Sequence, residues 1–178
     1  PEAERHVINL KPSDTVIELA ERIAERADLI HSGSVKPEID NMLKVTSDGK
    51  KLALDPRCFV PDSEDEKGSK LNEAAQRIYE IWEDTTDKKG TQIVFCDLST
   101  PKVKSEEYIY GLRFDAYNDL KYKLVQNGIP ADEVAFIHDA NTDEQKQTLF
   151  ERVNSGAIRV LIGSTEKSGA GTNMKKRH

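Results

Sequence analysis

Three short runs of mainly apolar residues constrain the fold of this chain more than any other feature of its sequence. They lie at residues 92–98, 134–138 and 158–162, and stretches with helical spacing of apolar residues separate them. Strands that are apolar on both faces are typical of parallel sheets, because helices then cover each side. We therefore predict an α/β fold built from βαβ units.

The stretches before and between these runs predict three helices. Ser69 is placed to cap a first helix, whose apolar positions recur every three or four residues. Residues 114–125 predict a second helix with one apolar face. Thr142 or Asp143 is placed to cap a third helix, which Gly156 ends.

The N-terminal part of the chain predicts one further helix with well-defined ends. Ser13 is a capping residue, residues 14–30 carry apolar side chains at helical spacing, and Gly33 follows. Residues 41–45 and 51–57 are short, and their pattern leaves helix and loop open.

A boundary is expected where the chain becomes acidic. Residues 62–66 read Asp-Ser-Glu-Asp-Glu between Pro61 and Gly68, a composition typical of a solvated linker. We therefore predict an N-terminal helical extension with an acidic linker over residues 1–68, and an α/β domain over residues 69–178.

Composition bounds the classes of function. The chain has 178 residues, 33% of them charged, and a net charge of −6, which argues against holding nucleic acid by bulk electrostatics. No apolar run is long enough for a membrane span and no signal peptide is recognisable, so we expect a cytoplasmic protein without membrane contact. Cys58 and Cys96 are the only cysteines, which favours reduced thiols.

The loops after the three predicted strands are candidates for a binding surface. Residues 97–102, 138–142 and 163–173 are rich in hydroxyl, amide and glycine residues, which suit hydrogen bonds to phosphate or ribose. Such residues also make turns and cap helices without binding anything. Parallel strands, however, bring all three loops to one edge of the sheet, where ligands bind in open α/β folds.

Well-known phosphate motifs do not match these loops. A Walker A loop starting at Gly163 fails, because Ser168 stands at the second glycine and Ala170 follows Gly169 in place of the lysine. A dinucleotide fingerprint fails at Met174.

Metal-ion and acid–base chemistry find little support in the sequence. The four histidines lack the spacing of metal ligands, so we predict no metal site. His138 and Asp139, at the end of the second strand, are either an acid–base pair or structural residues.

Together the loops resemble the second RecA-like domain of superfamily 2 helicases and translocases, most of all the Swi/Snf-type branch. Residues 92–100 resemble motif IV, residues 134–155 the strand, polar turn and helix that follow it, and residues 158–174 motif V. The amino-acid sequence at residues 95–101 and 137–143 further resembles that of large bacterial proteins that join a helicase to a DNA methylase.

The resemblance implies a RecA-like sheet with helices on both faces, a DNA or RNA track, and ATP with Mg²⁺ bound between this domain and a first RecA-like domain. It implies that the nucleic-acid backbone is contacted by Ser99, Thr100, Lys102, Ser164 and Thr165. It places Gly169 and Gly171 at the nucleotide and Asn173 toward the ATP ribose.

The sequence also departs from this family. The phosphate-gripping lysine loop, the acidic Mg²⁺ motif and the arginines of motif VI are missing, and the basic residues 175–177 are too few to replace the last of these. We therefore expect part of a larger motor, with no catalytic residue of its own and no ATP hydrolysis by itself.

Two alternatives remain open. One is a nucleotide-independent module that binds nucleic acid or protein through the same edge. The other, with less support, is a Rossmann-type methyltransferase that holds S-adenosylmethionine. In that class the glycine loop follows the first strand, whereas here it follows the last.

Overall fold

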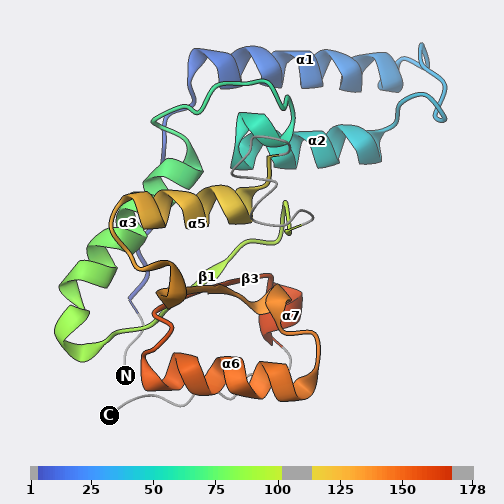
Figure 1. Cartoon of the computed structure of the whole chain (residues 1–178). Coiled ribbons are helices and arrows are strands. Elements are labelled where there is room, and N and C mark those ends of the chain that lie inside the picture. The colour runs from blue at the N-terminus through green and yellow to red at the C-terminus, as the bar shows by residue number, and fades with distance from the viewer. Residues whose placement is uncertain (1–3, 102–113, 170–178) are drawn as a thin grey trace.

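The computed structural model describes residues 4–101 and 114–169. Figure 1 shows a pair of helices at one end of the molecule and a small sheet between helices at the other. The elements are α1 (Asp14–His31), α2 (Met42–Leu54), α3 (Lys70–Asp84), β1 (Gln92–Phe95), α5 (Ala116–Gln126), β2 (Val134–Phe136), α6 (Asp143–Ser155), β3 (Val160–Gly163) and α7 (Thr165–Gly169), with 3-10 turns at Pro56–Cys58, Thr86–Lys88, Ala131–Glu133 and Ile137–Asp139.

The three predicted strands form one parallel sheet in the order β1–β3–β2. Gln92 lies opposite Val160 and Phe95 opposite Gly163, while Val134 pairs with Val160 from the other side. All four residues of β3 are buried, because this strand has a neighbour on each side and helices above and below. The predicted α/β class with a parallel sheet is confirmed.

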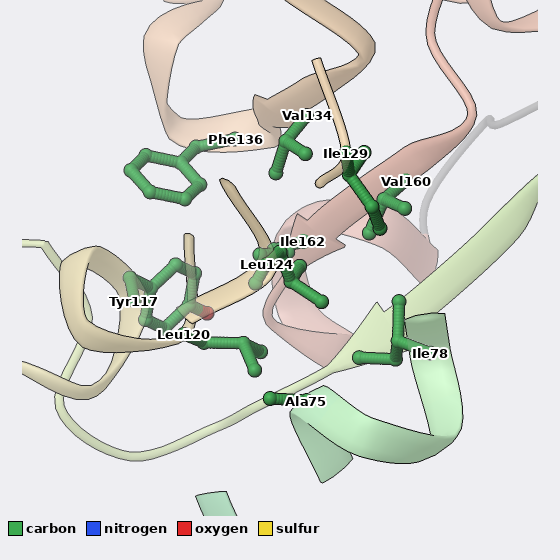
Figure 2. Close-up of a cluster of buried hydrophobic side chains, with 10 residues drawn as sticks. All are labelled: Ala75, Ile78, Tyr117, Leu120, Leu124, Ile129, Val134, Phe136, Val160 and Ile162. Atoms are coloured by element: carbon green, nitrogen blue, oxygen red, sulfur yellow. The ribbon is translucent and has the colours of Figure 1, made fainter. Parts of the chain in front are cut away.

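Helices α3 and α5 cover one face of the sheet, and α6 covers β2 and β3 on the other (Figure 1). On β1, Ile93 and Phe95 are exposed, so the prediction of helices on both faces does not hold for this strand. Successive residues of β3 serve the two faces in turn: Val160 and Ile162 pack toward α3 and α5, whereas Leu161 packs toward α6. Figure 2 shows the larger cluster converging on the sheet: Ala75, Ile78, Tyr117, Leu120, Leu124, Ile129, Val134, Phe136, Val160 and Ile162. The continuous apolar pattern of the third run follows from this double burial.

The strands are shorter than the runs that predicted them. β1 ends at Phe95 rather than at residue 98, because its neighbour β3 passes into α7 after Gly163. β2 ends at Phe136 rather than at residue 138, because the Ala140 N–H donates to the Ile137 carbonyl oxygen (3.2 Å) and closes a 3-10 turn. β3 begins at residue 160 rather than 158.

Arg159, directly before β3, is a charged residue that is only 3% exposed. Its guanidinium donates to the Gly90 carbonyl oxygen (3.2 Å) and the Thr85 hydroxyl (3.1 Å), and it stacks over the Trp82 ring at 4.8 Å. Burial lowers the pKa of Arg159, and the negative charge of Glu133 opposes that shift. The start of the central strand is thereby tied to the segment that follows α3.

The N-terminal helices pack against each other. Ser13 caps α1 as predicted, since its hydroxyl accepts the Val16 N–H (3.2 Å). Arg26 on α1 binds the carboxylates of Asp40 (2.8 Å) and Asp48 (3.0 Å), and Asp48 lies on α2. This ion-pair group links the two helices along one side.

Residues 41–45 and 51–57, which the sequence left open between helix and loop, are almost entirely helical. Asn41 caps α2 by accepting the Lys44 N–H (3.1 Å). The helix ends at Leu54, shortly before Pro56, which cannot continue an α-helix and instead opens a 3-10 turn. Of the two alternatives that the sequence left open, most of these residues therefore adopt the helix.

Arg57 joins the N-terminal extension to the α/β domain. Its guanidinium binds Asp55 beside it (2.8 and 2.9 Å) and Asp119 on α5 (3.1 Å for both oxygens). The side chain of Arg57 is 11% exposed, and those of Asp55 and Asp119 are 1% and 3% exposed. Burial alone would lower the pKa of Arg57, but the hydrogen bonds and charges of the two carboxylates outweigh burial and raise it.

The acidic stretch is not uniformly a solvated linker. Asp65 pairs with Arg57 (3.1 Å) and with Lys123 on α5, and it accepts a hydrogen bond from Asn72 (2.8 Å). Its neighbours Asp62 and Glu64 are exposed, as the sequence predicts. The linker is therefore pinned to α5 at one position.

None of the helices in residues 4–101 and 114–169 combines the length and apolar character needed to cross a membrane.

Replacing Arg57 by methionine tests the buried ion-pair group. The change leaves the buried carboxylate of Asp55 without its ion-pair partner and leaves Asp119 with the more distant Lys123 (3.6 Å), so we expect the free energy of unfolding to fall by about 3–5 kcal/mol. Urea denaturation measures it. The matched control is Arg77→Met, which removes an exposed arginine whose pair with Glu73 is worth about 0.5 kcal/mol. Equal losses in the two variants would show that the buried group is unimportant.

Candidate functional site

The carboxyl ends of the three strands meet at one edge of the sheet. Since β1 and β2 both run parallel to β3 and flank it, the loops that follow them begin on either side of the segment after β3. The short helix α7, which follows β3, contacts the turn after β2 (Figure 1). The structure therefore gathers the first residues of all three candidate loops, as the sequence predicted.

Thr165 is bound by a carboxylate from the neighbouring loop. Its N–H donates to Oδ1 of Asp97 (2.7 Å), and its hydroxyl donates to Oδ2 (2.9 Å). The two residues are 68 positions apart, the same offset as Gln92 and Val160 in the sheet, so the strand register extends into the loops. Sequence reasoning placed Asp97 in a candidate loop but did not identify it as the partner of Thr165.

Ser164 lies just inside this edge and is 8% exposed. Its hydroxyl accepts the N–H of Lys167 (3.3 Å), which is the geometry of a helix cap. A helix over Thr165–Gly169 replaces the loop that the glycines predicted, and Asp97 and Ser164 accept two N–H groups of its first turn, those of Thr165 and Lys167.

Ser99 organises the backbone after β1. It has a left-handed φ of +54°, uncommon for a residue other than glycine, and its hydroxyl accepts the Ala116 N–H (2.9 Å) at the start of α5. Ser99 and Thr100 are both partly exposed. Ser99 thus already has a structural role, while its position on the edge agrees with the prediction.

His138 lies behind this edge, in the turn after β2. Its ring meets that of Tyr117 edge-on at 5.2 Å, and its buried Nδ1 has no hydrogen-bond partner among the described residues. Burial lowers the pKa of His138, the positive charge of Lys167 lowers it further, and Asp139 opposes them. Asp139 does not bind Nδ1, so the two residues lack the hydrogen bond that orients an acid–base pair at that nitrogen.

The thiols at this end of the molecule are free. Burial raises the pKa of Cys58 to about 11 and also raises that of Cys96. At neutral pH both are therefore overwhelmingly thiols rather than nucleophilic thiolates.

The described part of the edge is predominantly acidic. Asp97, Asp139 and Glu166 are exposed there, against the single cation Lys167. No group of three acidic, histidine or cysteine residues suited to a metal ion occurs within residues 4–101 and 114–169. Any phosphate contact made by these residues therefore relies on hydroxyl and amide donors rather than on charge.

Lys102, Gly171 and Asn173 lie outside the described residues. Gly169 is the last residue of α7. The predicted nucleotide contacts therefore stay predictions, whereas four of the five predicted nucleic-acid contacts lie on the described edge.

Comparison with known proteins identifies no relative of this chain. No protein-family model matches the chain, and neither the curated proteins nor the solved structures contain a significant match.

The pKa of His138 is a measurable property of the edge. We expect an NMR titration of its ring protons to give a pKa below 6.5, with Lys167→Gln raising it and Asp139→Asn lowering it further. Because the folded protein resists protonation of this ring, His138 makes the free energy of unfolding decline as pH falls below about 6.5. A pKa that does not rise in Lys167→Gln would contradict the proximity of the two residues.

Proposed function

We propose that this chain supplies nucleic-acid backbone contacts to an ATP-dependent DNA helicase or translocase, as a RecA-like second domain of the Swi/Snf type. The observation that supports this most is the position of Ser164 and Thr165. They directly follow the buried central strand, at the edge where the loops after the other two strands begin. Ligands of open parallel sheets bind at this place.

In this proposal the protein binds nucleic acid through the phosphates of its backbone. Hydroxyl and backbone N–H donors lie on one edge at Thr165, Ser164, Ser99 and Thr100. Lys102 follows Thr100 closely in the sequence. Contacts of this kind position a protein on nucleic acid without reading its sequence. DNA or RNA would both fit, since no base-specific contact is involved.

The charge of the molecule sets the strength of this binding. With a net charge of −6 and a mostly acidic described edge, few cations are available to release counterions from DNA. We therefore propose weak binding by the isolated chain, with a salt dependence corresponding to only one or two phosphates.

ATP enters the proposal through the resemblance. Gly169, Gly171 and Asn173 would form one side of a nucleotide site, and a first RecA-like domain would supply the lysine loop and the Mg²⁺ ligands. Because the 178 residues contain neither, ATP hydrolysis is expected only when both domains are present.

One observation favours the alternative of a nucleotide-independent binding module. The N–H and hydroxyl of Thr165 already donate to Asp97, so these two donors have acceptors without a bound phosphate. An acidic edge of this kind also suits a basic protein partner better than it suits a polyanion such as nucleic acid.

ATPase measurements separate these two functions. A longer form of the protein that carries both RecA-like domains should hydrolyse ATP faster when DNA is added. An ATPase rate that DNA leaves unchanged would count against the motor and for the binding module.

Replacing Thr165 by alanine tests the phosphate contact in the chain itself. Loss of one hydroxyl donor is worth about 0.5–1.5 kcal/mol, so affinity for fluorescein-labelled single-stranded DNA should fall roughly two- to tenfold in anisotropy titrations. Thr148→Ala is the matched control, because that exposed threonine lies on α6 and donates only to its own helix, at the Glu144 carbonyl. Identical affinities for the two variants would remove Thr165 from the site.

A further inference from the structure

The side chain of Asp97 has Thr165 as its only hydrogen-bonding partner in the described part of the chain. Both carboxylate oxygens are used, one by the Thr165 N–H (2.7 Å) and one by the hydroxyl (2.9 Å). Both residues are exposed, so solvent or a ligand can reach the pair.

A threonine hydroxyl has one hydrogen to donate. A phosphodiester in nucleic acid has acceptor oxygens and a negative charge, and no hydrogen of its own. While the hydroxyl of Thr165 donates to Asp97, it cannot donate to a phosphate. The two anions also repel each other if both approach the same donors.

We propose that Asp97 regulates the phosphate contact of Thr165 by competing for it. In the free protein the carboxylate holds both donors, and nucleic acid binds only by displacing it. This inference rests on the proposed function and adds a regulatory residue that the sequence did not reveal.

The geometry allows a phosphate to replace Asp97 as the acceptor at Thr165. A surface pair of this kind is in contact with water, and no other described residue holds the carboxylate of Asp97 in place. Rotation of the Asp97 side chain frees both donors together. A cationic side chain from a neighbouring domain that paired with Asp97 would therefore raise the affinity of this edge for nucleic acid.

Asp97→Asn tests the competition, because asparagine keeps the shape of aspartate but not its charge. We expect affinity for fluorescein-labelled oligothymidylate to rise roughly three- to tenfold in anisotropy titrations at fixed salt. Asp139→Asn is the matched control, since it removes the same charge from the neighbouring loop without touching Thr165. The control should raise affinity less than Asp97→Asn, and its gain should disappear as salt screens the charge.

A double variant separates competition from simple charge removal. In the Thr165→Ala background, Asp97→Asn should gain no more affinity than Asp139→Asn does, because the hydroxyl that it would free is gone. A gain in the double variant that clearly exceeds the gain of Asp139→Asn would overturn the proposal. A loss of affinity in Asp97→Asn would overturn it too, since Asp97 would then position Thr165 for binding.

The same titrations distinguish failure of the proposed nucleic-acid function from failure of the competition alone. If the wild type, Thr165→Ala and Asp97→Asn all leave oligothymidylate unbound, the nucleic-acid function fails and the competition fails with it. If the wild type binds and Thr165→Ala weakens binding, but Asp97→Asn equals Asp139→Asn, only the competition is overturned. Circular dichroism checks that every variant is folded.

Discussion

The pairing of β3 with a parallel strand on each side is the constraint on which the rest of this structure depends. It aligns Gly163 with Phe95, and it fixes which side chains of the central strand face α3 and α5 and which face α6. A shift of the register by one residue would turn every one of these side chains to the opposite face. The same pairing places Thr165 beside Asp97, so the core and the candidate site share one cause.

The fold was largely predictable because burial leaves a clear mark on the sequence, most of all in β3, which is buried on both faces. Continuous apolar runs indicated the strands, and capping residues such as Ser13 and Ser69 indicated where helices begin. Strand ends were less predictable, because they depend on which backbone groups find a partner in the neighbouring strand. Arg159 illustrates the difficulty: a charge beside a buried strand is tolerated only because distant carbonyl and hydroxyl groups accept its hydrogen bonds.

The candidate site was predictable in position but not in detail. The glycines after Ser164 suggested a loop, whereas its first residues form a helix in which Asp97 accepts the Thr165 N–H. That contact joins residues far apart in sequence, so local pattern cannot reveal it, although the constant offset of 68 between β1 and β3 could have done so. The link of the N-terminal extension to α5 through Arg57 was hidden for the same reason.

The central claim is that nucleic acid binds the sheet edge through its phosphates. Titration of ¹⁵N-labelled protein with single-stranded DNA, followed by amide chemical shifts, tests it most directly. If the claim is right, the largest changes fall on Ser99, Thr100, Ser164 and Thr165, and they fade as salt is added. Changes centred on α1 and α2, or none at millimolar DNA, would contradict it.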